Sequence, residues 1–249
     1  MEIFGQTDIG RARRVNQDAF GTRMYGDTAV AVVCDGMGGA NAGEVASGIA
    51  SASFLESLDA FFEASQAGGG ASPDADAIRE AVADATGRAG ADVCERADTD
   101  AECHGMGTTL VAAVAFGKSA VVVNVGDSRA YHISGGAASQ VTRDHSVVED
   151  MVARGELTPR EARRHPNRNL ITRALGDATG AYPDVFPVTL QTGDYLLLCS
   201  DGLTNLLTCD ELSEEAGRGG ELSELCNRLI GEALRRGAPD NVTVVIIRV

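Results

Sequence analysis

Five aspartates stand at or near turns beside apolar, strand-like runs, and two of them share a short pattern. The run Val30-Ala-Val-Val-Cys leads to Asp35-Gly36, and the run Leu196-Leu-Leu-Cys-Ser leads to Asp201-Gly202. The other three are Asp18, Asp127 and Asp240. Because such turns lie at the ends of strands, folding can gather these carboxylates at one rim. Carboxylates without a histidine or cysteine set suit hard cations with oxygen ligands, such as Mg²⁺ or Mn²⁺.

An aspartate before a glycine is also a common turn, and aspartates often cap helices. By pattern alone, these structural roles stay open for all five positions. Gly36, Gly38 and Gly39 let the backbone turn tightly beside whatever Asp35 holds. The recurrence of the pattern at Asp201 favours a shared cation site over separate turns.

The composition is that of a globular protein with a strong negative charge. The 249 residues are 44% hydrophobic and 23% charged, the formal net charge is -15, and Lys118 is the only lysine. A chain of this length can bury a sizeable core. Nucleic acid and anionic membranes are unfavourable partners, because the overall field repels both.

Cysteine usage and hydropathy predict a cytoplasmic protein. The six cysteines form no Cys-x-x-Cys pair, and Cys34 and Cys199 lie inside apolar runs, so we expect reduced, buried thiols. The first residues lack a basic segment followed by an apolar core. No apolar run approaches the ~18 residues that a membrane-spanning helix needs.

The spacing of apolar residues predicts two pairs of helices among short strands. Helices are expected over 43–64 and 74–96, the second with Ser72 as its N-cap and Pro73 as its first residue. A second pair is expected over 208–216 and 221–236. Strands are expected in the first residues and over 30–35, 108–116, 120–125, 129–133, 138–142, 184–190, 194–200 and 241–249.

This order of elements favours an α+β fold with two antiparallel sheets face to face and helices outside. Residues 107–142 are expected to form one antiparallel meander, and residues 66–73 a flexible connection. The charged, irregular stretch 144–180 is predicted to be an insertion. Residues 1–249 are therefore expected to form a single domain.

Seven short motifs follow one another along nearly the whole chain. They are Asp8-Ile-Gly-Arg-Ala-Arg13-Arg-Val-Asn16-Gln17-Asp18, Asp35-Gly-Met-Gly-Gly39 with Ala42-Gly43-Glu44, Gly105-Met-Gly-Thr-Thr-Leu110, Asn124-Val-Gly126-Asp127-Ser-Arg129, Asp144-His145-Ser146, Ser200-Asp201-Gly202 and Asp240-Asn241-Val-Thr243. In this order they resemble the metal-dependent protein phosphatase family, type 2C, as a bacterial-type minimal catalytic domain without an added regulatory segment.

The resemblance implies a four-layer α-β-β-α sandwich, with two antiparallel sheets flanked by helix pairs and two Mn²⁺ or Mg²⁺ ions between the sheets. By matching position, Asp35 bridges the two ions and the Gly36 carbonyl binds one of them. Asp201 and Asp240 complete the protein ligands of the other ion. Asp127 matches the aspartate that binds a third ion in bacterial members, and Asp201 shares that ion.

The same match gives roles to three residues near the N-terminus. Gln17 and Asp18 hold metal-bound waters. Arg13 grips the substrate phosphate, for which a planar, bidentate guanidinium is suited. The resemblance therefore implies catalytic roles for Arg13, Asp18 and Asp35.

The implied reaction is the hydrolysis of phosphoserine and phosphothreonine in proteins without a phosphoenzyme. The ions lower the pKa of a bridging water, and the resulting hydroxide attacks phosphorus in line. Many eukaryotic members keep a proton-donating histidine just after the Asp-Gly pair, where this chain has Met37. A metal-bound water near Asp127 is the expected acid, and His165 is expected to be a surface residue.

The inserted segment, 144–180, resembles the flap beside the family's active site. Its six arginines make it basic in an acidic protein: Arg154, Arg160, Arg163, Arg164, Arg168 and Arg173. One hypothesis is that the flap attracts phosphorylated or acidic substrate segments. The alternative, equally supported by the sequence, is a solvated helix face with Arg–Glu pairs.

The sequence thus predicts a cytoplasmic, monomeric serine/threonine protein phosphatase that acts on phosphorylated proteins and opposes serine/threonine kinases. The alternative is a regulatory member of the same fold that binds a phosphoprotein without turnover. Intact Asp35, Asp201, Asp240 and Arg13 argue against that alternative, since a non-catalytic member typically loses metal ligands.

Overall fold

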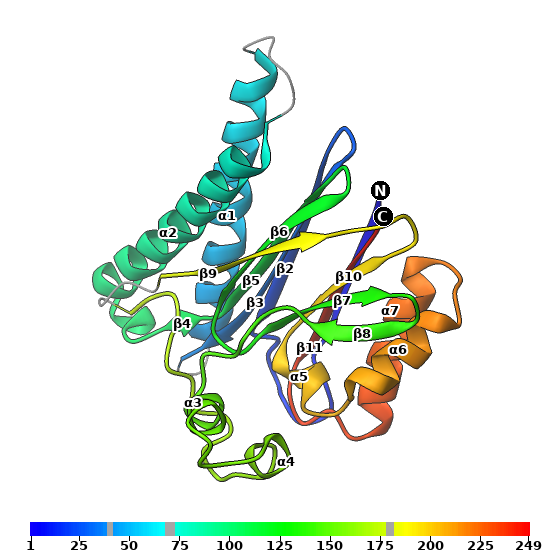
Figure 1. Ribbon diagram of the computed structural model, residues 1–249. Coiled ribbons are helices and arrows are strands. Elements are labelled where there is room, and N and C mark those ends of the chain that lie inside the picture. The colour runs from blue at the N-terminus through cyan, green and yellow to red at the C-terminus, as the bar shows by residue number, and fades with distance from the viewer. Residues whose placement is uncertain (39–41, 68–72, 178–181) are drawn as a thin grey trace.

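The computed structural model describes residues 1–38, 42–67, 73–177 and 182–249. Two antiparallel sheets lie face to face, and helices cover the outer side of each sheet (Figure 1). The expected α-β-β-α sandwich is confirmed. Parts of the sequence predictions lie outside the described residues, namely Gly39, Gly68 to Gly70, Ser72 and the end of the flap at 178–180.

The first sheet has six strands and the second has five. The first runs in the order β2 (Asp18–Tyr25), β3 (Thr28–Met37), β5 (Leu110–Phe116), β6 (Ser119–Val125) and β9 (Asp184–Thr189), with the short β4 (Gly107–Thr108) paired to β3. The second runs in the order β1 (Glu2–Asp8), β11 (Val242–Arg248), β10 (Tyr195–Cys199), β7 (Arg129–Ser134) and β8 (Ala137–Gln140).

The helices form pairs on the two outer faces, as predicted. On the first sheet lie α1 (Ala42–Ala67) and α2 (Ala75–Thr99), and on the second lie α6 (Cys209–Gly217) and α7 (Leu222–Arg235) (Figure 1). Shorter helices are the 3-10 helix η1 (Ala101–Cys103), α3 (Val147–Ala153), α4 (Pro159–Ala162) and α5 (Asp201–Thr204). None of the described helices is long and apolar enough to cross a membrane.

Side chains of β3 alternate between two separate cores. Val32 and Cys34 pack with α1 and α2, whereas Ala31 and Val33 pack between the sheets against residues of β10 and β11. The strand period of two therefore places Asp35 on the side that faces the other sheet. A carboxylate is carried in this way into the layer between the sheets.

The start of α2 differs from the prediction. Asp74 is the N-cap instead of Ser72, and its carboxylate accepts a hydrogen bond from the Ala77 amide at 2.9 Å. Pro73 precedes the cap and does not open the helix. A capping aspartate also places its negative charge at the positive end of the helix dipole.

Residues 107–142 do not form the single meander that was predicted. β5 pairs with β6 in the first sheet, whereas β7 pairs with β8 in the second. The chain crosses between the sheets over residues 126–128. Short apolar runs and turn residues look alike in hairpins and in crossovers, so the local pattern does not distinguish them.

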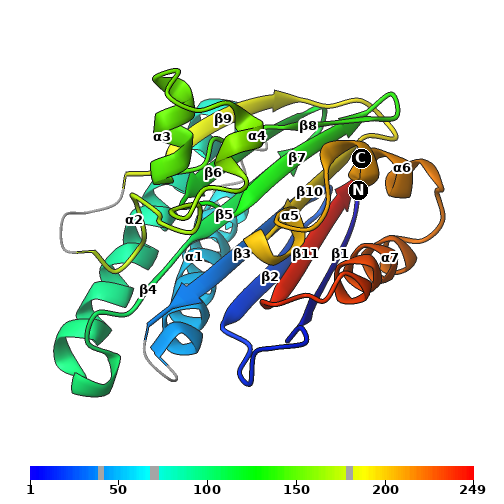
Figure 2. The ribbon, with the colours of Figure 1, turned by 90° about the horizontal axis from the view of Figure 1, so that it is seen from below.

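The flap leaves the sandwich after β8 and returns at β9, at the end of the molecule where α5 lies (Figure 2). Its base is joined by two isolated bridges, one between Ser146 and Ile171 and one between Thr108 and Leu175. The second bridge connects the flap directly to β4. The flap is therefore anchored next to the end of β3 that carries Asp35.

Glu211 connects the start of α6 to the end of α7. Its carboxylate accepts hydrogen bonds from the Thr208 amide at 2.8 Å and from Arg236 Nη1 at 3.0 Å. The bonds from Arg236 are the largest cause of a lowered pKa of Glu211, about 2 against an ordinary 4.5. Because the folded pKa is lower, this interaction stabilises the fold above about pH 4.5, and its contribution is lost as the pH falls toward 2.

We therefore expect Glu211→Gln to lower the melting temperature at pH 7, with the difference from the unsubstituted protein shrinking as the pH falls from 4.5 toward 2. Thermal unfolding at a series of pH values measures this. Glu214→Gln is the control, because that side chain is 71% exposed on the same helix. A difference in melting temperature between Glu211→Gln and the unsubstituted protein that does not depend on pH would contradict the stabilising role given to the Glu211 carboxylate.

Candidate active site

Asp18 and Asp35 lie opposite each other on neighbouring strands. The register pairs Asp18 of β2 directly with Asp35 of β3. Two threonines hold the backbone of Asp35: Thr109 Oγ1 accepts from its amide at 3.0 Å, and the Thr108 hydroxyl donates to its carbonyl at 3.0 Å. The two carboxylates are therefore fixed side by side at one end of the first sheet.

Asp201 is positioned differently from Asp35, although both precede a glycine. β3 continues past Asp35 to Met37, whereas β10 ends at Cys199 and Asp201 opens the short helix α5. The side-chain amide of Asn205, one turn later, donates through Nδ2 to Asp201 Oδ2 at 3.0 Å. The two similar sequence patterns thus hold their carboxylates on a strand and on a helical turn.

The glycine after each aspartate lets a second segment of backbone approach closely. A Cβ on Gly36 would lie 1.9 Å from the carbonyl oxygen of Gly43, at the start of α1. A Cβ on Gly202 would lie 1.9 Å from the carbonyl oxygen of Asn241. Gly202 therefore allows Asp240, the residue before Asn241, to come beside Asp201.

Asp127 lies in the crossover from the first sheet to the second, and His145 holds this crossover. The His145 amide donates to the Gly126 carbonyl at 2.9 Å, and its Nδ1 accepts from the Gly126 amide at 3.1 Å. Nε2 then carries the proton and donates to Asp184 Oδ2 at 3.1 Å. Burial is the main cause of the lowered pKa of His145, so the neutral ring that these bonds require is favoured.

Arg13 reaches the carboxylates from the loop between β1 and β2. Its Nη2 donates to Asp240 Oδ2 at 2.7 Å, and this bond is the largest cause of the raised pKa of Arg13. The negative charges of Asp35 and Asp201 raise that pKa further. The Arg13 side chain is 49% exposed, so most of its N–H donors remain free for another anion.

Four of the five carboxylates have raised pKa values. Burial is the largest cause in each case, and repulsion between the carboxylates adds to it. The pKa values of Asp18 and Asp127 rise to about 7, that of Asp35 lies well above its ordinary range, and that of Asp201 is also raised. These groups ionise together only beside a positive charge, so the set fits divalent cations with oxygen ligands.

Within the described ranges, no three side chains of His, Cys, Asp or Glu are arranged so that together they could hold a metal ion. Asp240 is bonded to Arg13, and Asp18 is held by neighbouring hydroxyl groups. Mg²⁺ usually keeps several waters and takes only one or two carboxylates from a protein. An open carboxylate set is therefore consistent with this kind of ion.

Hydrogen bonds from the second sheet hold Asp18. Its Oδ2 accepts from the Thr243 hydroxyl at 2.6 Å and from the Ser200 hydroxyl at 2.7 Å. The Thr243 hydroxyl uses its proton in the bond to Asp18, so in its contact with Thr7 at 2.7 Å the Thr7 hydroxyl is the donor. Thr7 Oγ1 in turn accepts from the side-chain amide of Asn16 at 2.8 Å. Asp18 Oδ1 is buried without a hydrogen-bond partner among the described residues. That oxygen is free to accept from a water.

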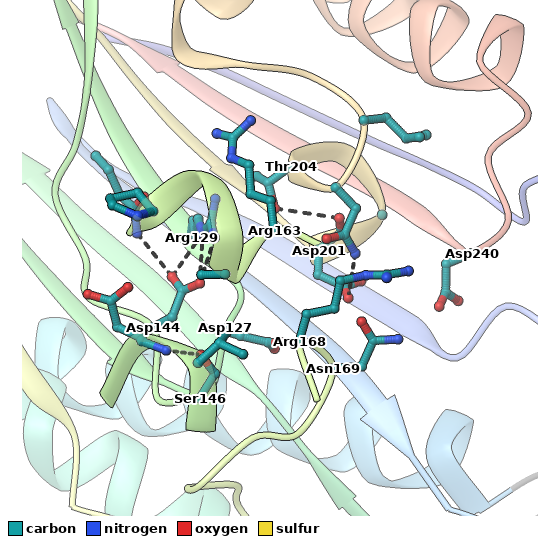
Figure 3. Close-up of a pocket in the computed structure, with 18 of the residues that line it drawn as sticks. Asp127, Arg129, Asp144, Ser146, Arg163, Arg168, Asn169, Asp201, Thr204 and Asp240 are labelled. Atoms are coloured by element: carbon teal, nitrogen blue, oxygen red, sulfur yellow. Dashed lines mark hydrogen bonds and ion pairs between the residues drawn. The ribbon is translucent and has the colours of Figure 1, made fainter. Parts of the chain in front are cut away.

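A pocket of about 560 Å³ lies between the flap and α5 (Figure 3). Of the predicted site residues, Asp127, Asp201 and Asp240 line it. Arg13 adjoins them through its bond to Asp240. Burial is the largest cause of the raised pKa of Asp35, and this residue lies near enough to Asp201 and Asp127 for their charges to raise that pKa further. The structure therefore gathers the carboxylates predicted from the sequence.

The groups that hold these carboxylates in place are not evident from the sequence. Ser200 and Thr243 are only members of motifs there, and no pattern marks Asn205, although it stands one helical turn after Asp201. His165 is partly buried and does not line the pocket. Met37 pairs with Gly107 of β4.

Asp35→Asn should stabilise the metal-free protein, because it removes a buried charge that its neighbours repel. In EDTA at pH 8 we expect a melting temperature higher by a few degrees, corresponding to about 1 kcal/mol. The further stabilisation by added Mn²⁺ or Mg²⁺ should shrink. Asp84→Asn, on the exposed face of α2, is the control. A less stable variant in EDTA with an undiminished metal response would contradict the cation site.

Gly202→Ala should push the Asn241 carbonyl away and separate Asp240 from Asp201. We expect lower thermal stability and a weaker response to added metal. Gly231→Ala is the matched control, because Gly231 is exposed on α7 with nothing within 4 Å of a Cβ. That substitution should raise stability by about 0.5–1 kcal/mol. Equal behaviour of the two variants in thermal unfolding would refute the close-approach argument.

Comparisons with known proteins agree with this geometry. A family model described as protein phosphatase 2C matches residues 8–236. The serine/threonine phosphatase Stp of Listeria monocytogenes is 37% identical over 243 residues, which cover 97% of this chain and 93% of that protein.

Solved structures share the whole fold. The serine/threonine phosphatase Stp1 of Staphylococcus aureus superposes with a TM-score of 0.89 at 36% identity, covering 100% of this chain and 94% of that one. The catalytic domain of the phosphatase PstP, in complex with two manganese ions, superposes with a TM-score of 0.81 at 32% identity and covers 98% and 96% of the two chains. The chain belongs to the metal-dependent protein phosphatase 2C family.

Proposed function

We propose that this protein hydrolyses phosphoserine and phosphothreonine in proteins with two Mn²⁺ or Mg²⁺ ions, and that Asp127 and Asp201 share a third. The observation that carries the proposal is a group of buried carboxylates that repel one another beside a half-exposed arginine. Such a group attracts cations, and the arginine beside it suits a phosphate. Membership of the family agrees with this chemistry.

In this proposal, Asp35, the Gly36 carbonyl, Asp201 and Asp240 would hold the two ions. When bound, the ions supply Lewis acidity, which lowers the pKa of a shared water and offsets charge on the phosphoryl oxygens. Burial first, and then the charges of Asp18 and Asp201, raise the pKa of Asp35. This carboxylate would therefore gain the most from positive charge supplied by the ions.

Asp18 orients a water through its free Oδ1. The bonds from Thr243 and Ser200 to Oδ2 prevent the carboxylate from rotating, so Oδ1 keeps one direction. Arg13 binds the substrate phosphate with the donors that Asp240 leaves free, because Nη2 alone is engaged. Asp240 thereby also fixes the direction of the guanidinium.

The reaction joins a water oxygen to phosphorus while the bond from phosphorus to the serine or threonine oxygen breaks. Inorganic phosphate leaves, and the side-chain oxygen takes up a proton. Met37 has no proton to give, and none of the four histidines, all within the described ranges, lines the pocket. We therefore propose that a water supplies this proton, near Asp127.

The proposal extends to partners and setting. Residues 1–249 would act as one catalytic domain and as a monomer, on proteins phosphorylated by serine/threonine kinases. The net charge of -15 disfavours nucleic acid and anionic membranes. The six cysteines are free, which suits the reducing cytoplasm.

Hydrolysis of p-nitrophenyl phosphate and of a phosphothreonine peptide tests the function. We expect no activity in EDTA, recovery with Mn²⁺ or Mg²⁺, and loss of at least 100-fold in Asp201→Asn. Arg13→Ala should lower kcat/KM by about 10–100-fold through the lost phosphate contact. Arg23→Ala, which removes a surface ion pair with Asp59, is the control for loss of an arginine.

The same experiment separates the enzyme from a non-catalytic binding protein. A phosphopeptide that binds but releases no phosphate with either metal would favour the binding protein. Release of phosphate that is unchanged in Asp201→Asn would contradict the assigned metal ligands.

A further inference from the structure

Arginines without an acidic partner gather in two segments of the described chain. Fourteen arginines form ion pairs with aspartate or glutamate. No ion pair or side-chain hydrogen bond within the described residues engages the other six, which are Arg11, Arg14, Arg160, Arg163, Arg164 and Arg168. The first two lie in the loop that carries Arg13, and the other four in and after α4 of the flap. In a protein with 36 acidic residues, such a distribution calls for an explanation.

The flap acids are engaged elsewhere. Glu161 accepts from the amide and the hydroxyl of Thr158, which closes the capping box of α4, at 2.8 and 2.6 Å. Glu156 is paired with Arg154 at 2.6 Å. The sequence-based alternative of a helix face with Arg–Glu pairs is therefore wrong for α4.

Two of the six free arginines, Arg163 and Arg168, line the pocket (Figure 3). Asp201 and Asp240 of the predicted metal site line the same pocket. The other arginine in the wall, Arg129, is neutralised by Asp144, to which its Nη2 donates at 2.6 Å. Free positive charge in the pocket wall thus comes from the flap.

The pocket is larger than a phosphate group, and its wall combines acidic, basic and apolar side chains. Its volume is about 560 Å³. Its acidic residues are Asp127, Asp144, Glu149, Asp201 and Asp240, and the free guanidinium groups belong to the flap, whose apolar contribution comes from Val148, Val152, Pro159 and Ala162. A phosphorylated residue bound beside Asp201 and Asp240 would therefore leave room beside the flap for another residue of the same substrate.

We propose that Arg163 and Arg168 bind an anionic side chain, a carboxylate or a second phosphate, that lies a few residues from the phosphoresidue in the substrate. The inference rests on the proposed phosphatase function and adds the class of substrate that the site prefers. Guanidinium groups bind carboxylates and phosphates through paired N–H donors. The contact lies within the pocket, so it persists at salt concentrations that screen the field of the whole protein.

The test compares kcat/KM on three phosphothreonine peptides that differ at the flanking position, which is alanine, aspartate or phosphoserine, at 0.15 M salt with Mn²⁺. We expect the unsubstituted enzyme to prefer at least one anionic peptide by roughly tenfold over the alanine peptide. In Arg163→Ala/Arg168→Ala the ratio should fall to about one. Arg164→Ala, from the same segment but outside the pocket wall, should keep the preference.

The two anionic peptides distinguish a carboxylate from a second phosphate as the preferred group. Equal rates on all three peptides would overturn the inference while leaving the phosphatase function intact. An undiminished preference for the anionic peptides in the double variant would overturn it too. So would a loss of that preference in Arg164→Ala that is as large as the loss in the double variant. If no peptide is hydrolysed with either metal, the proposed function itself fails.

Discussion

Repulsion among carboxylates held between two apolar sheets is the constraint on which the rest of the molecule depends. Burial and mutual repulsion raise the pKa values of Asp18, Asp35, Asp127 and Asp201, so the fold bears a cost for keeping them together. In the proposed function, a bound cation would offset that cost and contribute to the stability of the folded state. Metal binding and folding would then be linked through the same side chains.

The site also joins the two sheets. Asp18 belongs to the first sheet, and its carboxylate is bonded to Thr243 and Ser200 from the second. Asp127 lies where the chain crosses from one sheet to the other, and His145 ties that crossover to the flap. A change in how the sheets pack would therefore reach Asp18 directly, because Asp18 lies on one side of the interface and its carboxylate is bonded to residues of the other.

Charge is distributed to suit an anionic substrate despite the net charge of -15. Most arginines are neutralised by acidic partners, so the surface far from the pocket stays acidic. Unpaired arginines remain in the flap and in the loop of Arg13, on segments that border the site. The local field at the pocket thus differs from the field of the whole protein, which repels anions.

The sequence by itself determined both helix pairs, most of the strands and the identity of the carboxylates, but not β2 or the short helices α3, α4 and α5. Apolar periodicity is a local property, and it located β3 and both helix pairs. The Asp-Gly patterns and the ordered motifs identified Asp35, Asp201 and Asp240 before any fold was known. The N-cap of α2 was wrong by two residues, because Ser72 and Asp74 both suit a cap and local preference does not decide between them.

Only the tertiary structure decided which segments meet. Hairpin-like runs over 107–142 belong to two different sheets, and sheet pairing depends on contacts between residues far apart in the chain. The bonds that hold Asp18 join residues separated by 182 and 225 positions. The tertiary structure also decided which arginines of the flap lack an acidic partner. Glu161 could pair with an arginine or cap its own helix, and three-dimensional geometry selects the cap. Residue types can be inferred from local sequence, whereas the distances that turn them into a site arise from the packing of the whole chain.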